Sequence, residues 1–159
     1  MVIYHSNSPK DTQRLAAKIA RETESGVILL EGELGAGKTT FVQAFARALG
    51  VKAKVKSPTF NIIKKYKIPF RSNGYSLMAI RYLYHIDCYR LKDHKEAIPL
   101  GIQDVFSAAG GPASGGKASQ SVVLIEWPER ISKVLPKKRI RVHIDHIDKN
   151  KRKITISNF

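Results

Sequence analysis

The sequence predicts an α/β protein in which a mixed central sheet is flanked by helices. Two short apolar runs, at 27–30 and 122–125, have the pattern of strands buried on both faces, as in a parallel sheet. Residues 139–145 and 151–157 alternate like an antiparallel hairpin around a turn at 148–150. Parallel and antiparallel strands are therefore expected in one sheet, and the 159 residues are expected to form a single domain over 1–159.

Helices are expected on both sides of the first apolar run. Ser8 suits an N-cap, Pro9 suits the first helical position, and Asp11 lies where a carboxylate favours the exposed amides. Apolar residues then recur at helical spacing to about Glu24. After the strand at 27–30, a second segment with helical periodicity continues until Gly50.

The middle of the chain is expected to contain further strands. Residues 59–67 and 82–89 alternate between apolar and polar side chains, and 68–80 are expected to form a long hairpin excursion between them. Residues 100–106 are expected to form a short helix near Pro99. The following segment, 108–121, has no apolar periodicity, which indicates a mobile loop. A helical turn is expected to open at Pro128.

Composition indicates a cytoplasmic, soluble protein. The single cysteine, Cys88, cannot form an intramolecular disulfide and lies in an alternating apolar segment, so it is expected to pack as a small hydrophobic residue in a reducing compartment. The amino terminus lacks a basic stretch followed by an apolar run, and no segment reaches the roughly 18 apolar residues that span a bilayer.

The charge of the chain is strongly positive and concentrated in two segments. There are 28 Lys and Arg against 13 Asp and Glu, a net charge of +15. Residues 52–71 hold seven basic residues and no acidic one, and 129–153 hold ten basic against three acidic residues. Such fields attract nucleic acids and acidic protein surfaces. Basic runs also occur as merely solvated faces, so composition leaves both interpretations open.

The segment that follows the first apolar run matches a phosphate-binding loop, G-x-x-x-x-G-K-[ST], from Gly32 to Thr39. Its glycines allow the chain to turn amides inward around a phosphate, and the helix behind it favours an anion. Lys38 is expected to bind the β and γ phosphates and to act in catalysis, and the Thr39 hydroxyl is expected to bind Mg²⁺. The expected nucleotide contacts of the loop come from Glu33, Leu34, Gly35, Ala36, Gly37, Lys38, Thr39 and Thr40. This motif, between a buried strand and a helix, predicts a fold of the P-loop NTPase type.

Two carboxylates are candidates for the chemistry beside this loop. Phosphoryl transfer needs an acid for the metal ion and the attacking water, normally at the end of an adjacent apolar strand. Glu126 follows the run at 122–125 and is expected to bind Mg²⁺ and to take part in catalysis; its alternative is an ordinary strand-end carboxylate. Asp87 is the second catalytic candidate, with the alternative that it satisfies a backbone amide or a lysine.

Two further motifs are less specific. Ser57-Pro58-Thr59-Phe60 could place Thr59 at the γ-phosphate or the metal, as in a nucleotide-sensing loop, although the same sequence also forms simple turns. The acidic and histidine residues at 143–148 resemble a metal site only in composition. Neighbouring residues of a strand point to opposite faces, which argues against a common metal there.

Four motifs occur together in one order: EGELGAGKTTF at 31–41, SPTF at 57–60, HIDCYRL at 85–91 and LIEWPER at 124–130. Together they closely resemble the TsaE (formerly YjeE) family, the small ATPases of bacterial tRNA threonylcarbamoyladenosine synthesis. The resemblance covers nearly the whole chain, and four motifs in order are far more specific than any one of them.

The resemblance implies that the chain binds a TsaB–TsaD-type heterodimer and hydrolyses ATP, so that the complex can cycle while it modifies the adenosine next to the anticodon. The tRNA is then reached through that complex, with direct contact left open. The residues that match the family motifs are Lys38 and Thr39 for phosphate and metal, Thr59 for the switch-like loop, Asp87 and Glu126 for the carboxylates, and Trp127 for the neighbouring tryptophan at the nucleotide. The segments 71–81 and 108–121 depart from the family pattern, which bears on the surface that faces the partner.

Three other functions are weighed against ATP hydrolysis. A small-molecule kinase would need an arginine-bearing lid, and 108–121 carries only Lys117. A GTPase is disfavoured because the guanine-reading Asn-Lys-x-Asp is absent; the nearest match, at 150–153, ends in lysine. A nucleotide-gated RNA-binding protein stays open because of the basic segments.

Overall fold

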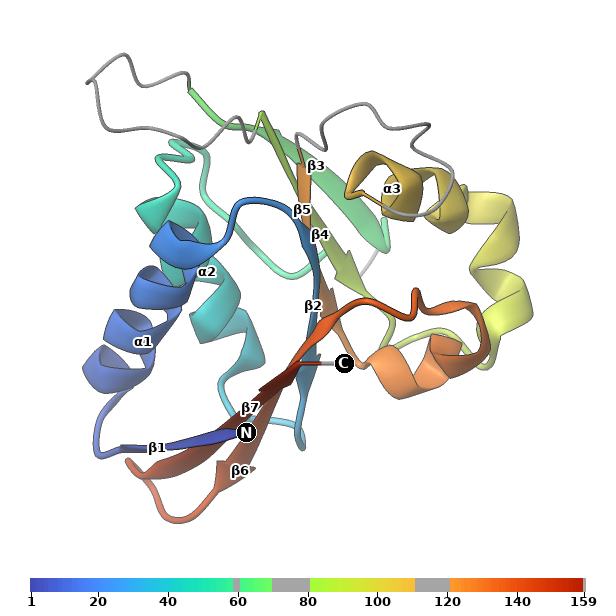
Figure 1. Ribbon diagram of the computed structural model, residues 1–159. Helices are drawn as coiled ribbons and strands as arrows, with labels where there is room; N and C mark the ends of the chain where they lie inside the picture. Colours follow the sequence, from blue (N-terminus) through green and yellow to red (C-terminus); the bar gives the residue numbers. More distant parts are fainter. Residues whose placement is uncertain (59–60, 70–80, 111–120, 159) are drawn as a thin grey trace.

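A seven-stranded mixed sheet forms the centre of the molecule (Figure 1). The computed structural model describes residues 1–58, 61–69, 81–110 and 121–158. The strands, in the spatial order β1-β7-β6-β2-β5-β4-β3, are β1 (Val2–Ser6), β7 (Arg152–Asn158), β6 (Ile140–His146), β2 (Gly26–Glu31), β5 (Ser121–Glu126), β4 (Tyr82–Asp87) and β3 (Ile63–Lys67). The predicted α/β class with a mixed sheet is confirmed.

The sheet has a parallel centre and antiparallel edges. Strand β2 pairs in parallel with β5 and β6, and β5 pairs in parallel with β4. The outer pairs, β6 with β7, β7 with β1 and β4 with β3, are antiparallel. The predicted hairpin near the carboxyl end is the β6–β7 pair, and both predicted buried strands, β2 and β5, lie in the parallel centre. Strand β5 is buried along its whole length, as its continuous apolar run indicates.

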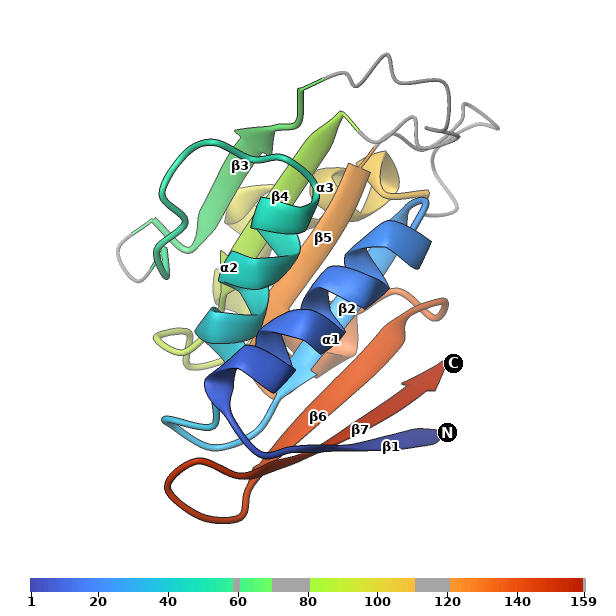
Figure 2. The ribbon, with the colours of Figure 1, turned by 90° about the vertical axis from the view of Figure 1, so that its left-hand side faces the viewer.

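Helices cover the two faces of the sheet separately (Figures 1 and 2). On one face, α1 (Pro9–Glu22) packs against α2 (Lys38–Ala48), with Phe41 and Phe45 of α2 fully buried. On the other face lie α3 (Ile102–Ala108) and the 3₁₀ segment η4 (Pro128–Val134). Two shorter 3₁₀ turns, η1 (His94–Glu96) and η2 (Ile98–Leu100), precede α3. Each face therefore has its own hydrophobic core.

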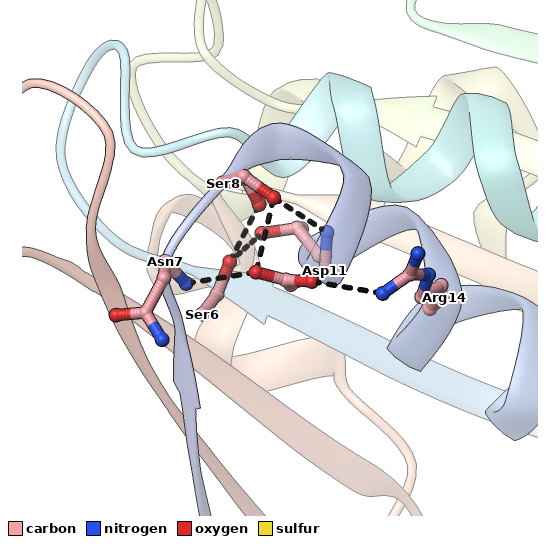
Figure 3. Close-up of polar contacts among 6 residues, drawn as sticks. Ser6, Asn7, Ser8, Asp11 and Arg14 are labelled. Atoms are coloured by element: carbon pink, nitrogen blue, oxygen red, sulfur yellow. Dashed lines mark hydrogen bonds and ion pairs between the residues drawn. The ribbon is translucent and has the colours of Figure 1, made fainter.

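Ser8 is the N-cap of α1, as the sequence predicts (Figure 3). The Ser8 hydroxyl accepts from the amide of Asp11 and donates to the Asp11 carboxylate, which also accepts from the amide of Asn7. The side chain of Ser6 donates to the carbonyl of Ser8 and contacts the hydroxyl of Thr12. The Ser8 hydroxyl satisfies the Asp11 amide, which the helix start leaves unpaired, and the contacts of Ser6 join β1 to α1.

Several element boundaries differ from the sequence-based expectations. Strand β3 begins at Ile63, because the amides of Asn61 and Ile62 donate to the Pro58 carbonyl in a turn. Helix α3 begins at Ile102, after η2, because Gly101 has a left-handed φ of 72° between them. Strand β1 was not predicted. The expected excursion at 68–80 and the expected loop at 108–121 lie mostly outside the described residues.

Within the described ranges of the chain, no helix is long and apolar enough to cross a bilayer.

Replacing Ser8 by alanine removes the side-chain acceptor for the Asp11 amide at the N-cap. We expect the free energy of unfolding to fall by about 1 kcal/mol, measured by urea denaturation. Ser8→Thr keeps a hydroxyl at this position and serves as the matched control, with stability near that of the parent. Equal losses in both variants would show that the hydroxyl is not what stabilises this end of α1.

Candidate functional site

The register of the parallel strands brings the candidate site together. Leu30 of β2 lies opposite Glu126 of β5, and Glu126 lies opposite Asp87 of β4. The three strands therefore end at one level, and the chain leaves β2 there to form the phosphate loop. Ligands of parallel α/β sheets bind beyond the carboxyl ends of the strands, which is where both predicted carboxylates lie.

The phosphate loop begins at a glycine that no other residue can replace without a shift of the backbone. Gly32 has a φ of 132°, and a Cβ at this position would lie 2.3 Å from the carbonyl oxygen of Ile144 in β6. At the other end of the loop, Gly37 forms the N-cap of α2 with a left-handed φ of 109°. The two glycines let the loop pass close to β6 and then turn directly into the helix.

An arginine of β7 holds the loop from outside. The Arg152 Nε donates to the carbonyl of Ala36 at 2.9 Å, and its guanidinium also donates to the carbonyl of Gly35 at 3.4 Å. Because the carbonyl and the next amide of a trans peptide point in opposite directions, the Gly37 amide is turned away from Arg152. Arg152 of β7 thus orients the loop so that the Gly37 amide remains available at the start of α2.

Lys38 is almost completely buried within the loop, with 5% of its surface exposed. Its ammonium group donates to the carbonyls of Gly32 at 2.6 Å and Glu33 at 2.9 Å, and lies 3.7 Å from the centre of the Trp127 ring. Burial lowers the pKa of Lys38, and the carboxylates of Glu126, Glu129 and Asp87 oppose that shift. The cation is therefore held by carbonyl dipoles and an aromatic face rather than by a direct carboxylate partner among the described residues.

Glu126 connects three elements at the centre of the site. Its carboxylate accepts from the Thr39 hydroxyl of α2, at 3.1 and 3.0 Å for its two oxygens, and from the His85 Nε2 of β4 at 2.9 Å. Glu126 is 3% exposed and His85 is fully buried. The other ring nitrogen of His85 is buried without a hydrogen-bond partner in the described ranges, so Glu126 makes the one hydrogen bond to this ring within those ranges.

Asp87 lies beside Glu126 and is engaged by loop residues. One of its carboxylate oxygens accepts from the Ser57 hydroxyl, and the other accepts from the amide of Tyr89 at 3.1 Å. The side chain is 7% exposed. Asp87 therefore does satisfy a backbone amide, which was its alternative role, and it also links the end of β4 to the segment that leads to Thr59.

An aromatic pair borders the loop. Trp127 adopts a left-handed φ of 59°, which carries the chain sharply from β5 into η4 and leaves its ring beside Lys38. The Tyr89 ring packs against it at 5.0 Å between centroids. Around the same loop, Leu34 is 76% exposed and Tyr89 is 45% exposed.

The structure brings together the side chains of Lys38, Thr39, Glu126 and Trp127, and places Asp87 next to Glu126 in register. Glu33, Leu34 and Gly35 form the exposed part of the loop, Ala36 is buried, and Thr40 follows Thr39 in α2. Thr59 lies outside the described residues. Motif spacing alone did not single out His85 or Arg152, although His85 lies within the HIDCYRL motif.

The histidine and acidic residues of β6 do not form a metal site. His143 instead contacts the carboxylates of Glu31 and Asp145, and Glu31 also accepts from Arg141 at 2.6 Å. In the described part of the chain, no group of three or more histidine, cysteine or acidic side chains is arranged to hold a metal.

The residues present fit a triphosphate and a divalent cation. The loop offers a helix start, glycine backbone and a buried ammonium group, which together suit phosphate oxygens. The Thr39 hydroxyl and the Glu126 carboxylate are oxygen ligands of the kind that Mg²⁺ prefers, and Mg²⁺ in such sites is commonly bound by few protein oxygens together with phosphates and water.

Comparisons with known proteins agree on one family. The family model described as threonylcarbamoyl adenosine biosynthesis protein TsaE matches residues 6–154. The chain is similar to the tRNA threonylcarbamoyladenosine biosynthesis protein TsaE of Bacillus subtilis, with 36% identity, 94% of this chain and 81% of that protein covered. The TsaE protein of Treponema pallidum is 31% identical, with 96% and 97% covered. The crystal structure of YdiB from Bacillus subtilis superposes with a TM-score of 0.70 at 30% identity, with 99% and 84% covered.

The single cysteine is predicted to be unreactive in the folded protein. Cys88 is fully buried next to Asp87, and burial, together with the negative charges of Asp87 and Glu129, raises the pKa of its thiol to about 12. At pH 8 we expect a thiol reagent such as DTNB to label the native chain at least about 100-fold more slowly than the urea-unfolded chain. Similar rates in both states would contradict the buried position of Cys88.

Proposed function

The chain belongs to the TsaE family, and from this premise we propose that it is a Mg²⁺-dependent ATPase that supports threonylcarbamoyladenosine synthesis in tRNA by acting on a TsaB–TsaD-type complex. The relatives described above are named for this biosynthesis. The superposition on YdiB supports the same P-loop fold over nearly the whole chain. Nucleotide hydrolysis, the identity of the metal and the partner are the parts that we propose.

The contact between Thr39 and Glu126 carries the proposal. These residues are 87 positions apart in the chain, yet the hydroxyl and the carboxylate lie within 3.1 Å of each other beside the phosphate loop. In this proposal the two side chains hold Mg²⁺ between α2 and β5. Bound Mg²⁺ would neutralise part of the charge on the phosphates, as it does in P-loop NTPases generally.

Lys38 supplies the positive charge for the β and γ phosphates. Its ammonium group now donates to two loop carbonyls, at 2.6 and 2.9 Å. Phosphate oxygens are stronger acceptors because they are charged, so binding of the triphosphate draws Lys38 toward them. Because Trp127 lies 3.7 Å from this ammonium group, the change of acceptors from carbonyl to phosphate oxygens alters the surroundings of its ring.

We propose that Asp87, rather than Glu126, orients the attacking water. Both oxygens of Glu126 are engaged by Thr39, and one is also engaged by His85, which suits a metal-binding role. The two oxygens of Asp87 accept from the Ser57 hydroxyl and the Tyr89 amide, and Ser57 belongs to the motif that contains Thr59. We therefore assign metal binding to Glu126 and water positioning to Asp87, with a general-base contribution of about 10²–10⁴ in rate.

The surface near the loop suits a protein partner. Leu34, at the exposed part of the phosphate loop, and Tyr89, packed on Trp127, leave apolar surface in solvent close to the nucleotide site. A contiguous exposed apolar patch commonly marks a protein contact, and in this proposal the two side chains contribute to one. In this proposal the TsaB–TsaD-type complex covers this region, which makes hydrolysis depend on the partner.

Replacing Lys38 by alanine removes the cation that binds the phosphates. We expect ATP hydrolysis in the presence of a purified TsaB–TsaD-type complex to fall at least about 100-fold, because an electrostatic contact made in the transition state is lost. The measurement is phosphate release with and without the complex, and thermal melting checks that the variant is folded. A folded Lys38→Ala chain that hydrolyses ATP like the parent would refute the proposal.

Glu126→Gln and Asp87→Asn separate the two assigned roles, because each keeps the size of its side chain. Both are expected to lower hydrolysis by about 100-fold or more. Only Glu126→Gln is expected to abolish the effect of Mg²⁺ on ATP affinity, measured by calorimetry with and without EDTA. If Asp87→Asn abolishes the Mg²⁺ effect and Glu126→Gln leaves it intact, the two assignments are reversed.

A further inference from the structure

A groove between two short 3₁₀ segments lies outside the nucleotide site. It has a volume of about 570 Å³ and runs between the residues around η1 and those of η4. These two segments contact each other on the face of the sheet opposite α1 and α2. A volume of this size is within the range of ligand-binding clefts.

The groove is basic. Lys92, Lys95, Arg130 and Lys133 line it with exposed side chains, and His94 adds a fifth group that becomes cationic when protonated. Within the described ranges, none of the three lysines or Arg130 forms an ion pair. Their positive charge is therefore available to a ligand.

Two carboxylates also line the groove, and they do not cancel this charge. Asp93 caps η1, because one of its oxygens accepts from the amide of Lys95 at 2.7 Å. Glu129 lies near enough to Lys38 and Cys88 to influence both groups electrostatically. Four permanent cations therefore face two carboxylates, in a chain of net charge +15.

The lining favours a phosphodiester backbone over a protein segment. The eight residues that line the groove, all in the described part of the chain, include no aliphatic side chain and no Phe, Tyr or Trp. Protein segments that dock in grooves usually insert apolar anchors, whereas contacts to nucleic-acid phosphates need mainly Lys and Arg. The groove offers Lys and Arg for contacts to phosphates and lacks pockets lined by apolar side chains.

The groove is joined to the nucleotide site by short segments of the chain. Glu126 binds Thr39, Trp127 packs on Lys38, and Pro128 begins η4, which bears Arg130 and Lys133. On the other side of the groove, Tyr89 packs on Trp127 three residues before Lys92. Both walls of the groove thus start from the same aromatic pair beside the phosphate loop.

We propose that this groove binds the phosphate backbone of RNA directly. The proposal goes beyond ATP hydrolysis and does not depend on it, because no groove residue has a role in the assigned chemistry. It gives the chain its own contact with RNA, in addition to contact through a partner complex.

The test compares two double charge reversals that change the net charge equally. Lys95→Glu with Lys133→Glu alters the groove, and Lys10→Glu with Lys18→Glu alters exposed positions of α1 on the opposite face of the sheet. Binding of a fluorescent, unmodified tRNA transcript is followed by anisotropy between about 50 and 250 mM salt. Thermal melting verifies folding, and calorimetry with ATP reports the nucleotide site separately.

We expect the groove variant to bind tRNA about tenfold or more weakly than the parent, with a salt slope reduced by about 1 to 2, because two phosphate contacts are lost. The α1 variant is expected to stay within about threefold of the parent.

Equal loss in both variants would overturn the proposal, since net charge alone would then explain binding. A parent chain that does not bind tRNA would overturn it as well. The proposal would also be overturned if the chain bound poly-glutamate more tightly than tRNA and the groove variant lost that binding. The ligand of the groove would then be an acidic protein segment and not RNA. If the parent chain does not bind ATP, the proposed function is refuted, but the result on RNA binding is unaffected.

Discussion

The hydrogen bond between the Thr39 hydroxyl and the Glu126 carboxylate joins the two halves of the candidate site, and the rest of the architecture serves to form it. Parallel pairing of β2 with β5 places the phosphate loop and Glu126 at one edge of the sheet. Gly32 lets the loop pass against β6, and Gly37 turns it into α2 so that Thr39 faces Glu126. Without this register, a phosphate loop and a carboxylate would be present in the chain but would not form one site.

Burial gives this contact its chemical character. Lys38, His85, Asp87 and Glu126 are all buried where α2 meets the sheet, which is costly for charged groups unless each is paired. The carboxylates are paired by hydroxyl, amide and imidazole donors, while Lys38 is held by carbonyls and by the Trp127 ring. In the proposed function, a divalent cation would offset the negative charge that a triphosphate adds beside these two carboxylates. The same Trp127 leads directly into the basic groove, which links the two surfaces through one short segment.

Sequence patterns predicted the features that rest on local chemistry. The phosphate loop, the Ser8 cap, both buried strands and the closing hairpin depend on residue types at short spacing, and the structure contains all of them. Strand β1 escaped prediction because its residues are mostly exposed and it is stabilised by pairing with distant β7. His85 and Arg152 escaped for the same reason: their partners, Glu126 and the loop carbonyls, are far away in the chain, so only the tertiary register shows what they contact.

A double-mutant cycle on Thr39 and Glu126 tests the central claim most directly. Thr39→Val removes the proposed hydroxyl ligand, and Glu126→Gln replaces the proposed charged ligand by a neutral amide that keeps one oxygen, both at nearly constant volume. ATP affinity is measured by calorimetry with and without Mg²⁺. If the two side chains hold one metal ion, each single variant loses the Mg²⁺-dependent part of the affinity and the double variant loses no more than the worse single one. Additive losses that are the same with and without Mg²⁺ would contradict a shared metal site.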